Sequence, residues 1–178
     1  MSLVTILGGA RSGKSTAAEA WARRWPGAVV YIATAEGGDD EMRERIERHR
    51  ARRPPEWLTL EEPIALATAL DRAVDALALI DCLSLWVSNL AGEGQEDDAV
   101  IAAARSAARV AAERQTPTIA VSNEVGLGVV PASPLGRRYR DLLGLVNQEW
   151  VAASGASYFV VAGRLLPLHE FPEGLHDV

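Results

Sequence analysis

Lysine and cysteine are almost missing from this sequence of 178 residues. Of its 18 basic residues only Lys14 is a lysine, and Cys82 is its single cysteine. One cysteine excludes a disulfide within the chain and a cysteine metal cluster, and it fits a reducing compartment, so we expect a cytoplasmic protein. A lone lysine among arginines indicates either chance or a position that needs a compact ammonium in place of a planar guanidinium.

Positive charge and long apolar runs are also scarce. The net charge of -6 leaves no basic surplus to hold a nucleic-acid backbone, so nucleic acid is not an expected partner. No uncharged run approaches the roughly 20 residues that span a bilayer, and residues 1–7 lead directly into a glycine-rich loop, unlike a signal peptide. The length and the 48% hydrophobic content predict one globular domain over residues 1–178, without a membrane span.

Short apolar runs alternate with longer stretches of helical period. This alternation is typical of βαβ units and predicts an α/β fold with a mainly parallel central sheet flanked by helices. Strands are expected over residues 3–7, 29–33, 57–60, 77–81, 118–122 and 158–162, and helices over 15–24, 40–53, 63–74, 97–114 and 137–154. Residues 91–95 and 126–136 are expected to be loops. The tail 164–178 has no clear period and is expected to be partly disordered.

A glycine-rich loop follows the first expected strand and precedes the first expected helix. Its spacing, G-x-x-x-x-G-K-[ST], is that of a P-loop, in which backbone N–H groups and a lysine hold the phosphates and the last hydroxyl binds Mg²⁺. The alternative is a glycine-rich turn without a ligand. The predicted nucleotide-binding residues are Gly8, Gly9, Ala10, Arg11, Ser12, Gly13, Lys14 and Ser15, with Lys14 also catalytic and Ser15 also a metal ligand.

A P-loop also requires a carboxylate at the end of a neighbouring strand to hold Mg²⁺. Asp81 fits this role because it ends the apolar run 77–80. It is alternatively an N-cap for the segment that follows. Cys82 beside it is expected to be a small buried apolar residue.

His49 lies near the end of the second expected helix, among Arg45, Arg48, Arg50, Arg52 and Arg53. One interpretation is a histidine stabilised by the negative end of the helix dipole. The other is a site residue in an arginine-lined phosphate pocket. The other two histidines, His169 and His176, lie in the poorly patterned tail.

Several stretches, in this order, resemble the bifunctional adenosylcobinamide kinase/adenosylcobinamide-phosphate guanylyltransferase family. They are GGARSGKS from Gly8, YIATAE from Tyr31, DDEMRERIERHRARRP from Asp39, WLTLEEP from Trp57, LIDCLSLWVSNL from Leu79, VSNEVGLGVVP from Val121 and GRRYRDLLGLVNQ from Gly136. The resemblance covers nearly the whole chain up to about Ala162. Asp81 departs from the relatives that carry glutamate there, and the tail from Leu165 departs from the short ending of the family.

The resemblance implies a RecA-like P-loop fold, a homotrimer and a reaction in two steps. First, ATP or GTP phosphorylates the aminopropanol hydroxyl of adenosylcobinamide. Then GTP transfers GMP to an enzyme histidine, and adenosylcobinamide phosphate takes it up to give adenosylcobinamide-GDP, with release of pyrophosphate.

By the same resemblance, His49 is the histidine that accepts GMP. It also implies nucleotide contacts from the P-loop and from Ala33, Thr34, Ala35, Arg50, Ala51, Arg52, Arg53, Glu61 and Asp81. Imidazole is a good nucleophile near neutral pH, and arginines can stabilise the charge on the phosphoryl oxygens. Ser15 and Asp81 are the expected ligands of Mg²⁺.

Two further sets of residues lie near the expected site, and the role of the second is left open. Asn123 and Glu124 close a strand at the edge where ligands of α/β folds gather, so both are candidate site residues. Arg137, Arg138 and Arg140 have three interpretations: they lie near the nucleotide, at a subunit interface, or on a solvated helix face. We expect the last of these.

Two other functions fit a P-loop. A small-molecule kinase of another pathway would leave His49 structural and form no covalent intermediate, and a nucleotide-binding switch would yield no product from cobinamide.

Overall fold

The computed structural model describes residues 2–38 and 40–170. Its strands are β1 (Leu3–Gly8), β2 (Val29–Ala33), β3 (Leu58–Glu61), β4 (Leu77–Asp81), β5 (Thr118–Asn123), β6 (Ala156–Val161) and β7 (Arg164–Leu168). They form one sheet in the order β3-β2-β4-β5-β1-β6-β7. The first six strands run parallel and β7 runs antiparallel to β6, so the predicted α/β class with a mainly parallel sheet is confirmed.

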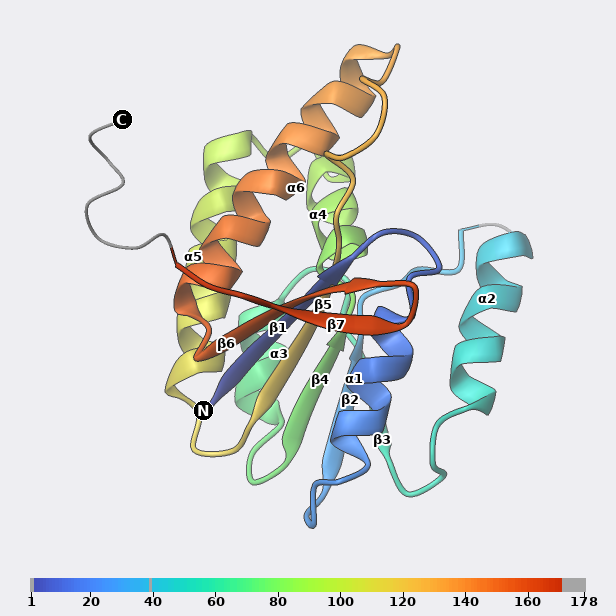
Figure 1. Ribbon diagram of the computed structural model, residues 1–178, viewed down its shortest axis with the longest axis vertical. Helices are drawn as coiled ribbons and strands as arrows, with labels where there is room; N and C mark the ends of the chain where they lie inside the picture. The colour runs from blue at the N-terminus through green and yellow to red at the C-terminus, as the bar shows by residue number, and fades with distance from the viewer. Residues whose placement is uncertain (1, 39, 171–178) are drawn as a thin grey trace.

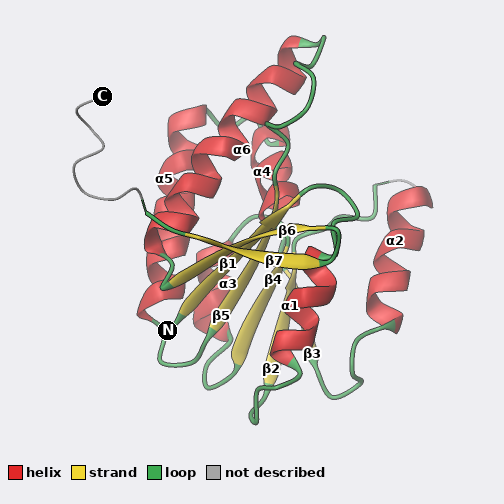
Figure 2. Cartoon of the chain, in the orientation of Figure 1, coloured by secondary structure: helices red, strands yellow, loops and turns green. Residues whose placement is uncertain are grey.

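Helices connect the strands and cover both faces of the sheet (Figures 1 and 2). They are α1 (Lys14–Ala22), α2 (Asp40–Ala51), α3 (Leu66–Arg72), α4 (Leu83–Gly92), α5 (Asp97–Glu113) and α6 (Pro134–Ala153). In Figure 1, α2 stands beside α1 at the margin of the molecule. No helix in residues 2–38 and 40–170 has the length and hydropathy to cross a membrane.

Two hydrophobic clusters hold the layers together, one on each face of the sheet. Alternate residues of a strand point to opposite faces, so Val30 and Ile32 of β2 join the cluster under α3, α4, α5 and α6. Val29 and Tyr31 of the same strand join the cluster under α1. Burial on both faces explains why the strands are mostly apolar rather than alternating.

Helix α4 was not predicted. It begins at Leu83, only two positions after the end of β4 at Asp81, and no polar linker separates the strand from the helix. Its buried residues Leu83, Trp86, Val87 and Leu90 nevertheless have the spacing of one helix face, which is the signal that could have revealed it.

The predicted loop 126–136 ends earlier than expected, because α6 begins at Pro134. Proline suits the first turn of a helix, and the Ser133 side chain caps it by accepting a hydrogen bond from the Gly136 N–H. The second expected loop, 91–95, overlaps the end of α4 at Gly92.

Residues 164–168 of the tail form β7, a strand that the sequence did not predict. Strand β7 continues from β6 through Ala162 and Gly163, both with positive φ. The expectation for residues 171–178 lies outside the described residues.

The turn between β6 and β7 packs against the glycine-rich loop. The Gly163 N–H donates to the Ser12 carbonyl at 2.8 Å. A Cβ on Gly13, whose φ is +99°, would lie 3.3 Å from the Gly163 Cα. The contact therefore requires glycine at residue 13 for both conformation and space.

Arg114, which follows α5, joins that helix to the end of α3. Its guanidinium donates to the carbonyl oxygens of Leu70, Ala73 and Ala76 and to the Thr116 hydroxyl. The Leu70 and Ala73 carbonyls also accept backbone hydrogen bonds from Ala73 and Ala76, so Arg114 adds a charged donor to the carbonyls at the end of α3.

We expect Arg114→Met to lower the free energy of unfolding by roughly 1.5–3 kcal/mol, because hydrogen bonds from a charged donor to half-buried carbonyls are lost. Urea denaturation measures the change. Arg109→Met is the control, since Arg109 forms only an exposed pair with Glu113 and should change stability by less than about 0.5 kcal/mol. Equal losses in the two variants would contradict the role given to Arg114.

Candidate active site

The register of the sheet brings the predicted site residues to one edge. Ala33 at the end of β2 is paired with Glu61 on one side and with Asp81 on the other. Gly8 at the end of β1 is paired with Asn123 of β5. Because these strands are parallel, all of their carboxyl ends meet where α/β folds bind ligands.

The glycine-rich loop lies between β1 and α1, as predicted. A Cβ on Gly8 would lie 2.6 Å from the Ser12 Oγ and 2.7 Å from the Val160 oxygen, so the loop closes only with glycine there. Helix α1 has Gly13 as its N-cap residue and no side-chain cap, which leaves its first N–H groups for an anion. Lys14 is buried, and its Nζ donates to the Gly9 carbonyl at 3.2 Å.

Asp81, at the end of β4, contacts side chains of three other elements, α1, β2 and α2. Its Oδ1 accepts a hydrogen bond from the Ser15 Oγ at 3.3 Å. Its Oδ2 accepts one from the Tyr31 hydroxyl at 2.5 Å and lies 3.3 Å from the His49 Nδ1. One carboxylate therefore links the P-loop helix α1, the strand β2 and the histidine helix α2.

The environment of Asp81 keeps it ionised. Burial by itself raises the pKa of this carboxyl, but hydrogen bonds from His49 and Tyr31 and the charges of His49 and Lys14 outweigh it. The pKa of Asp81 is consequently below its ordinary value. An ionised carboxylate can hold a cation or the N–H of an imidazole.

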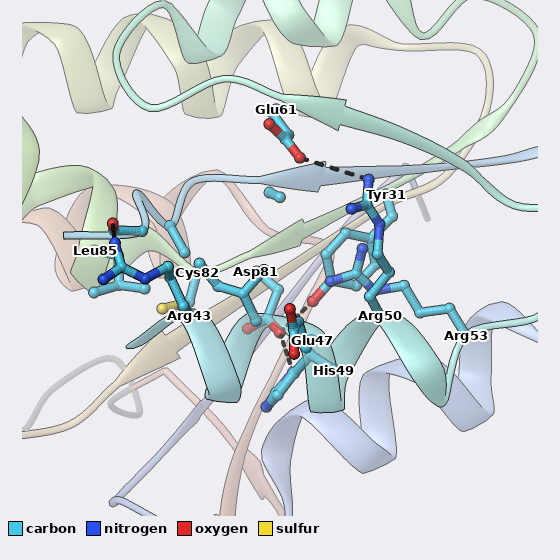
Figure 3. A pocket seen from close by; sticks show the side chains of 14 residues that line it. Tyr31, Arg43, Glu47, His49, Arg50, Arg53, Glu61, Asp81, Cys82 and Leu85 are labelled. Atoms are coloured by element: carbon cyan, nitrogen blue, oxygen red, sulfur yellow. Dashed lines mark hydrogen bonds and ion pairs between the residues drawn. The ribbon is translucent and has the colours of Figure 1, made fainter. Parts of the chain in front are cut away.

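A cavity of about 300 Å³ lies between α2 and the edge of the sheet (Figure 3). It is lined by Tyr31, Ala33, Ala35, Gly37, Arg43, Ile46, Glu47, His49, Arg50, Arg53, Glu61, Asp81, Cys82 and Leu85. Figure 3 shows His49 directed toward Asp81 and Arg50 toward Glu61. His49, the two arginines Arg50 and Arg53, and the carboxylates of Glu61 and Asp81, all predicted, therefore share one cavity.

Two arginines from the end of α2 contribute positive charge to this cavity. The Arg50 Nη2 lies 3.7 Å from the Glu61 Oε1. The Arg53 guanidinium lies 3.4 Å from the centre of the Tyr31 ring and donates to the Thr59 hydroxyl at 3.2 Å. A guanidinium held over an aromatic ring is positioned without losing its charge, which suits the binding of phosphate.

Several residues that were predicted to contact the nucleotide do not line the cavity. Thr34 is fully buried, and its hydroxyl donates to the Cys82 carbonyl at 2.7 Å and accepts from the Cys82 N–H at 2.9 Å. The Arg52 side chain pairs with the buried Glu19 of α1 at 3.5 Å. Ala51 is exposed at the end of α2, and no residue of the loop 8–15 is among those lining the cavity. Asp81 is the residue that connects the loop to the cavity.

Sequence analysis missed Tyr31 and six other lining residues, namely Gly37, Arg43, Ile46, Glu47, Cys82 and Leu85. Tyr31 lies two positions before Ala33, so the period of a strand places both on one face, a signal that was present. Arg43, Ile46, Glu47 and Arg50 have the spacing of one helix face, which a prediction centred on His49 did not use. Cys82 is buried as expected, and it and Leu85 also line the cavity.

The candidates outside the cavity make structural contacts. The Asn123 Nδ2 donates to the Ser84 Oγ, and the Glu124 Oε1 accepts from the Gly126 N–H. Arg137 donates to the carbonyls of Pro131 and Ala132, and Arg138 pairs with Asp97. Arg140 pairs with Asp141. All three arginines are half-buried, and their expected place on a solvated helix face stays a prediction.

The residues around Asp81 suit Mg²⁺. Ser15 and Asp81 present a hydroxyl and an ionised carboxylate next to one another, and Mg²⁺ prefers oxygen ligands. Within the part of the chain that the structure describes, no group of three or more His, Cys, Asp and Glu gathers as a metal site. Mg²⁺ fits such a sparse donor set because it retains waters and binds phosphates with only one or two protein ligands.

The strand, glycine loop and helix, with a carboxylate at the end of a second strand, define a P-loop nucleotide-binding protein. In fold it resembles a solved structure of a prototypical ATPase from the type III secretion system of pathogenic bacteria, with a TM-score of 0.54 and 12% identity. The likeness covers 89% of this chain and 50% of that one, and it shows the fold alone.

The chain belongs to the cobinamide kinase / cobinamide phosphate guanyltransferase family, whose model matches residues 4–168. It is 47% identical to the bifunctional adenosylcobalamin biosynthesis protein CobP of Pseudomonas aeruginosa, over 94% of this chain and 97% of the relative. The proteins of the same description named CobU from Salmonella typhimurium and Escherichia coli are 39% and 37% identical, over 90% of this chain and 96% of each relative. The resemblance seen in the sequence is thereby confirmed.

Thr34 yields a prediction about how the site is held in shape. We expect Thr34→Val to lower the free energy of unfolding by about 2 kcal/mol or more, because the buried N–H and carbonyl of Cys82 both lose a partner. Thr34→Ser keeps the hydroxyl and should retain most of the stability. Urea denaturation of the two variants measures this, and a serine variant as unstable as the valine one would contradict it.

Proposed function

We propose that this chain is a bifunctional transferase that acts on adenosylcobinamide. It phosphorylates the aminopropanol hydroxyl with ATP or GTP, and then transfers GMP from GTP through a guanylylated His49 to give adenosylcobinamide-GDP. The observation that carries the proposal is the carboxylate of Asp81, which contacts Ser15 of the P-loop and His49 of α2 at once. Membership of the family supports both activities.

In the kinase step, the P-loop holds the triphosphate. The N–H groups of residues 8–15 surround its oxygens, and Lys14 reaches the β- and γ-phosphates. Ser15 and Asp81 would hold Mg²⁺, which, when bound, neutralises charge that develops on the phosphates. Catalysis is then mainly positioning and charge stabilisation, so the buried Lys14 needs the compact ammonium that arginine lacks.

In the guanylyl step, His49 is the nucleophile. Contact of its Nδ1 with Asp81 favours the tautomer that keeps a proton on Nδ1 and a lone pair on Nε2. Nε2 attacks the α-phosphorus of GTP, an N–P bond forms, and the bond to the bridging oxygen breaks to release pyrophosphate. Asp81 stabilises the positive charge on the substituted ring. A phosphate oxygen of adenosylcobinamide phosphate then displaces the imidazole and takes the GMP.

The cavity supplies groups that suit a guanine nucleotide. Arg50 and Arg53 can pair with phosphate oxygens, and the Glu61 carboxylate can accept hydrogen bonds from the N–H groups of guanine. Ala33 and Ala35 are small enough to leave space for a flat base. In the same proposal, Thr34, Ala51 and Arg52 belong to the shell that holds these residues in place.

The proposal includes a homotrimer in the cytoplasm. Support for self-association comes from exposed apolar side chains between β5 and the start of α6, namely Leu127, Val129, Val130 and Leu135, with Val129 95% exposed. The free, buried Cys82 fits a reducing compartment.

Sedimentation equilibrium tests the oligomer. We expect a mass about three times the 19.1 kDa of one chain, and dissociation when Val129 and Leu135 are both replaced by aspartate, because charge opposes burial of that surface. A wild-type protein that sediments as a monomer at all concentrations would exclude the trimer.

Labelling with GTP that carries ³²P in the α-phosphate tests the transferase. Wild-type protein should retain label in an acid-labile, base-stable bond, and His49→Ala should reduce it at least about 100-fold because the nucleophile is missing. Phosphorylation of cobinamide should be spared.

His169→Ala is the matched control, since His169 is exposed and lies outside the cavity lining. Persistent label in His49→Ala would show that His49 is not the nucleophile. Loss of the kinase activity together with the label would indicate a damaged fold instead.

A further inference from the structure

Tyr31 contacts the same carboxylate oxygen as the histidine. It lies in the middle of β2 with 1% of its surface exposed, and its hydroxyl donates to the Asp81 Oδ2. The His49 Nδ1 lies 3.3 Å from this oxygen, whereas Ser15 contacts Oδ1. Figure 3 shows Tyr31 and His49 meeting at Asp81 from β2 and α2.

The two oxygens of Asp81 thus face different parts of the site. Oδ1 faces the P-loop helix, and Oδ2 faces the cavity. Rotation about the last side-chain bond of an aspartate is soft, so the orientation of its carboxylate is decided by its hydrogen-bond partners. Of the two partners of Oδ2, Tyr31 is the one built into the sheet.

The tyrosine itself is firmly held. Its ring packs in the hydrophobic cluster beneath α1, and the Arg53 guanidinium lies 3.4 Å from its centre. Burial, and then the negative charge of Asp81, raise the pKa of the Tyr31 hydroxyl. The hydroxyl therefore remains a donor in neutral solution.

We propose that Tyr31 is a positioning residue for guanylyl transfer, which holds Oδ2 of Asp81 against Nδ1 of His49 so that Nε2 is the attacking nitrogen. The inference rests on the proposed function. It assigns Tyr31 mainly to guanylyl transfer, because Tyr31 contacts the oxygen that faces His49, whereas Ser15 contacts the other oxygen. During the attack the proton stays on Nδ1 next to Oδ2, the N–P bond forms at Nε2, and pyrophosphate leaves.

Tyr31→Phe removes only the hydroxyl and keeps the ring on which Arg53 lies. We expect the rate of protein labelling at saturating α-labelled GTP to fall about tenfold or more, since a charge-assisted hydrogen bond is lost. The rate of cobinamide phosphorylation should fall less than the rate of labelling, because Ser15 still contacts Oδ1 of Asp81. The control is Tyr139→Phe, which loses a half-buried hydroxyl bonded to the Ser84 carbonyl at 3.0 Å, away from Asp81.

Nitrogen-15 NMR of histidine in the nucleotide-free proteins provides a readout independent of activity. In the wild type and in Tyr139→Phe, His49 should carry its neutral-form proton on Nδ1. In Tyr31→Phe the His49 signals should shift toward the Nε2–H tautomer, because the carboxylate is no longer held, whereas those of His169 should not move.

Three outcomes overturn the inference. Labelling of Tyr31→Phe at the wild-type rate with an unchanged His49 tautomer would exclude a positioning role. An equal loss of labelling and kinase rates would mean that the hydroxyl only supports the fold. Absence of label on the wild-type protein would overturn the proposed function itself, and the inference with it.

Discussion

The site depends on the compensation of one buried negative charge. An ionised carboxylate is costly to remove from water unless polar groups replace its hydration. At Asp81 the replacements come from separate elements: Ser15 from α1, Tyr31 from β2 and His49 from α2. Helices α1 and α2 and strand β2 thus meet at Asp81, because its buried negative charge needs polar partners. In the proposed function, both reactions use this point, because it faces the phosphate loop on one side and the cavity on the other.

Charge also explains the composition of α2. This helix contacts the rest of the chain through ion pairs of His49 and Arg50, and just beyond its end Arg52 and Arg53 add an ion pair and a cation–π contact. Such contacts are individually weak where they are exposed. Their concentration at one end of the helix leaves the guanidinium groups next to the cavity, so the residues that attach the helix are also the ones suited to bind phosphate.

Features that depend on local pattern could be predicted from the sequence. The P-loop spacing, the strand that ends on Asp81 and the arginines around His49 are each contiguous in the chain, and the alternation of elements predicted the sheet. Two contacts were not predictable: the hydrogen bond of Tyr31 to Asp81, and the two hydrogen bonds of the Thr34 hydroxyl to the backbone of Cys82. Both depend on the register between β2 and β4. Strand β7 was missed because an edge strand with most of its side chains exposed lacks a hydrophobic period.

The contact between Gly163 and the phosphate loop has a consequence for the order in which the protein matures. Synthesis on the ribosome releases residues 8–15 well before residue 163, so the loop lacks this backbone partner until the hairpin of β6 and β7 has emerged. A nascent chain lacking the final hairpin has the amino acids of a nucleotide site without its finished shape. The shape of the phosphate loop is thereby tied to a segment made about 150 residues later.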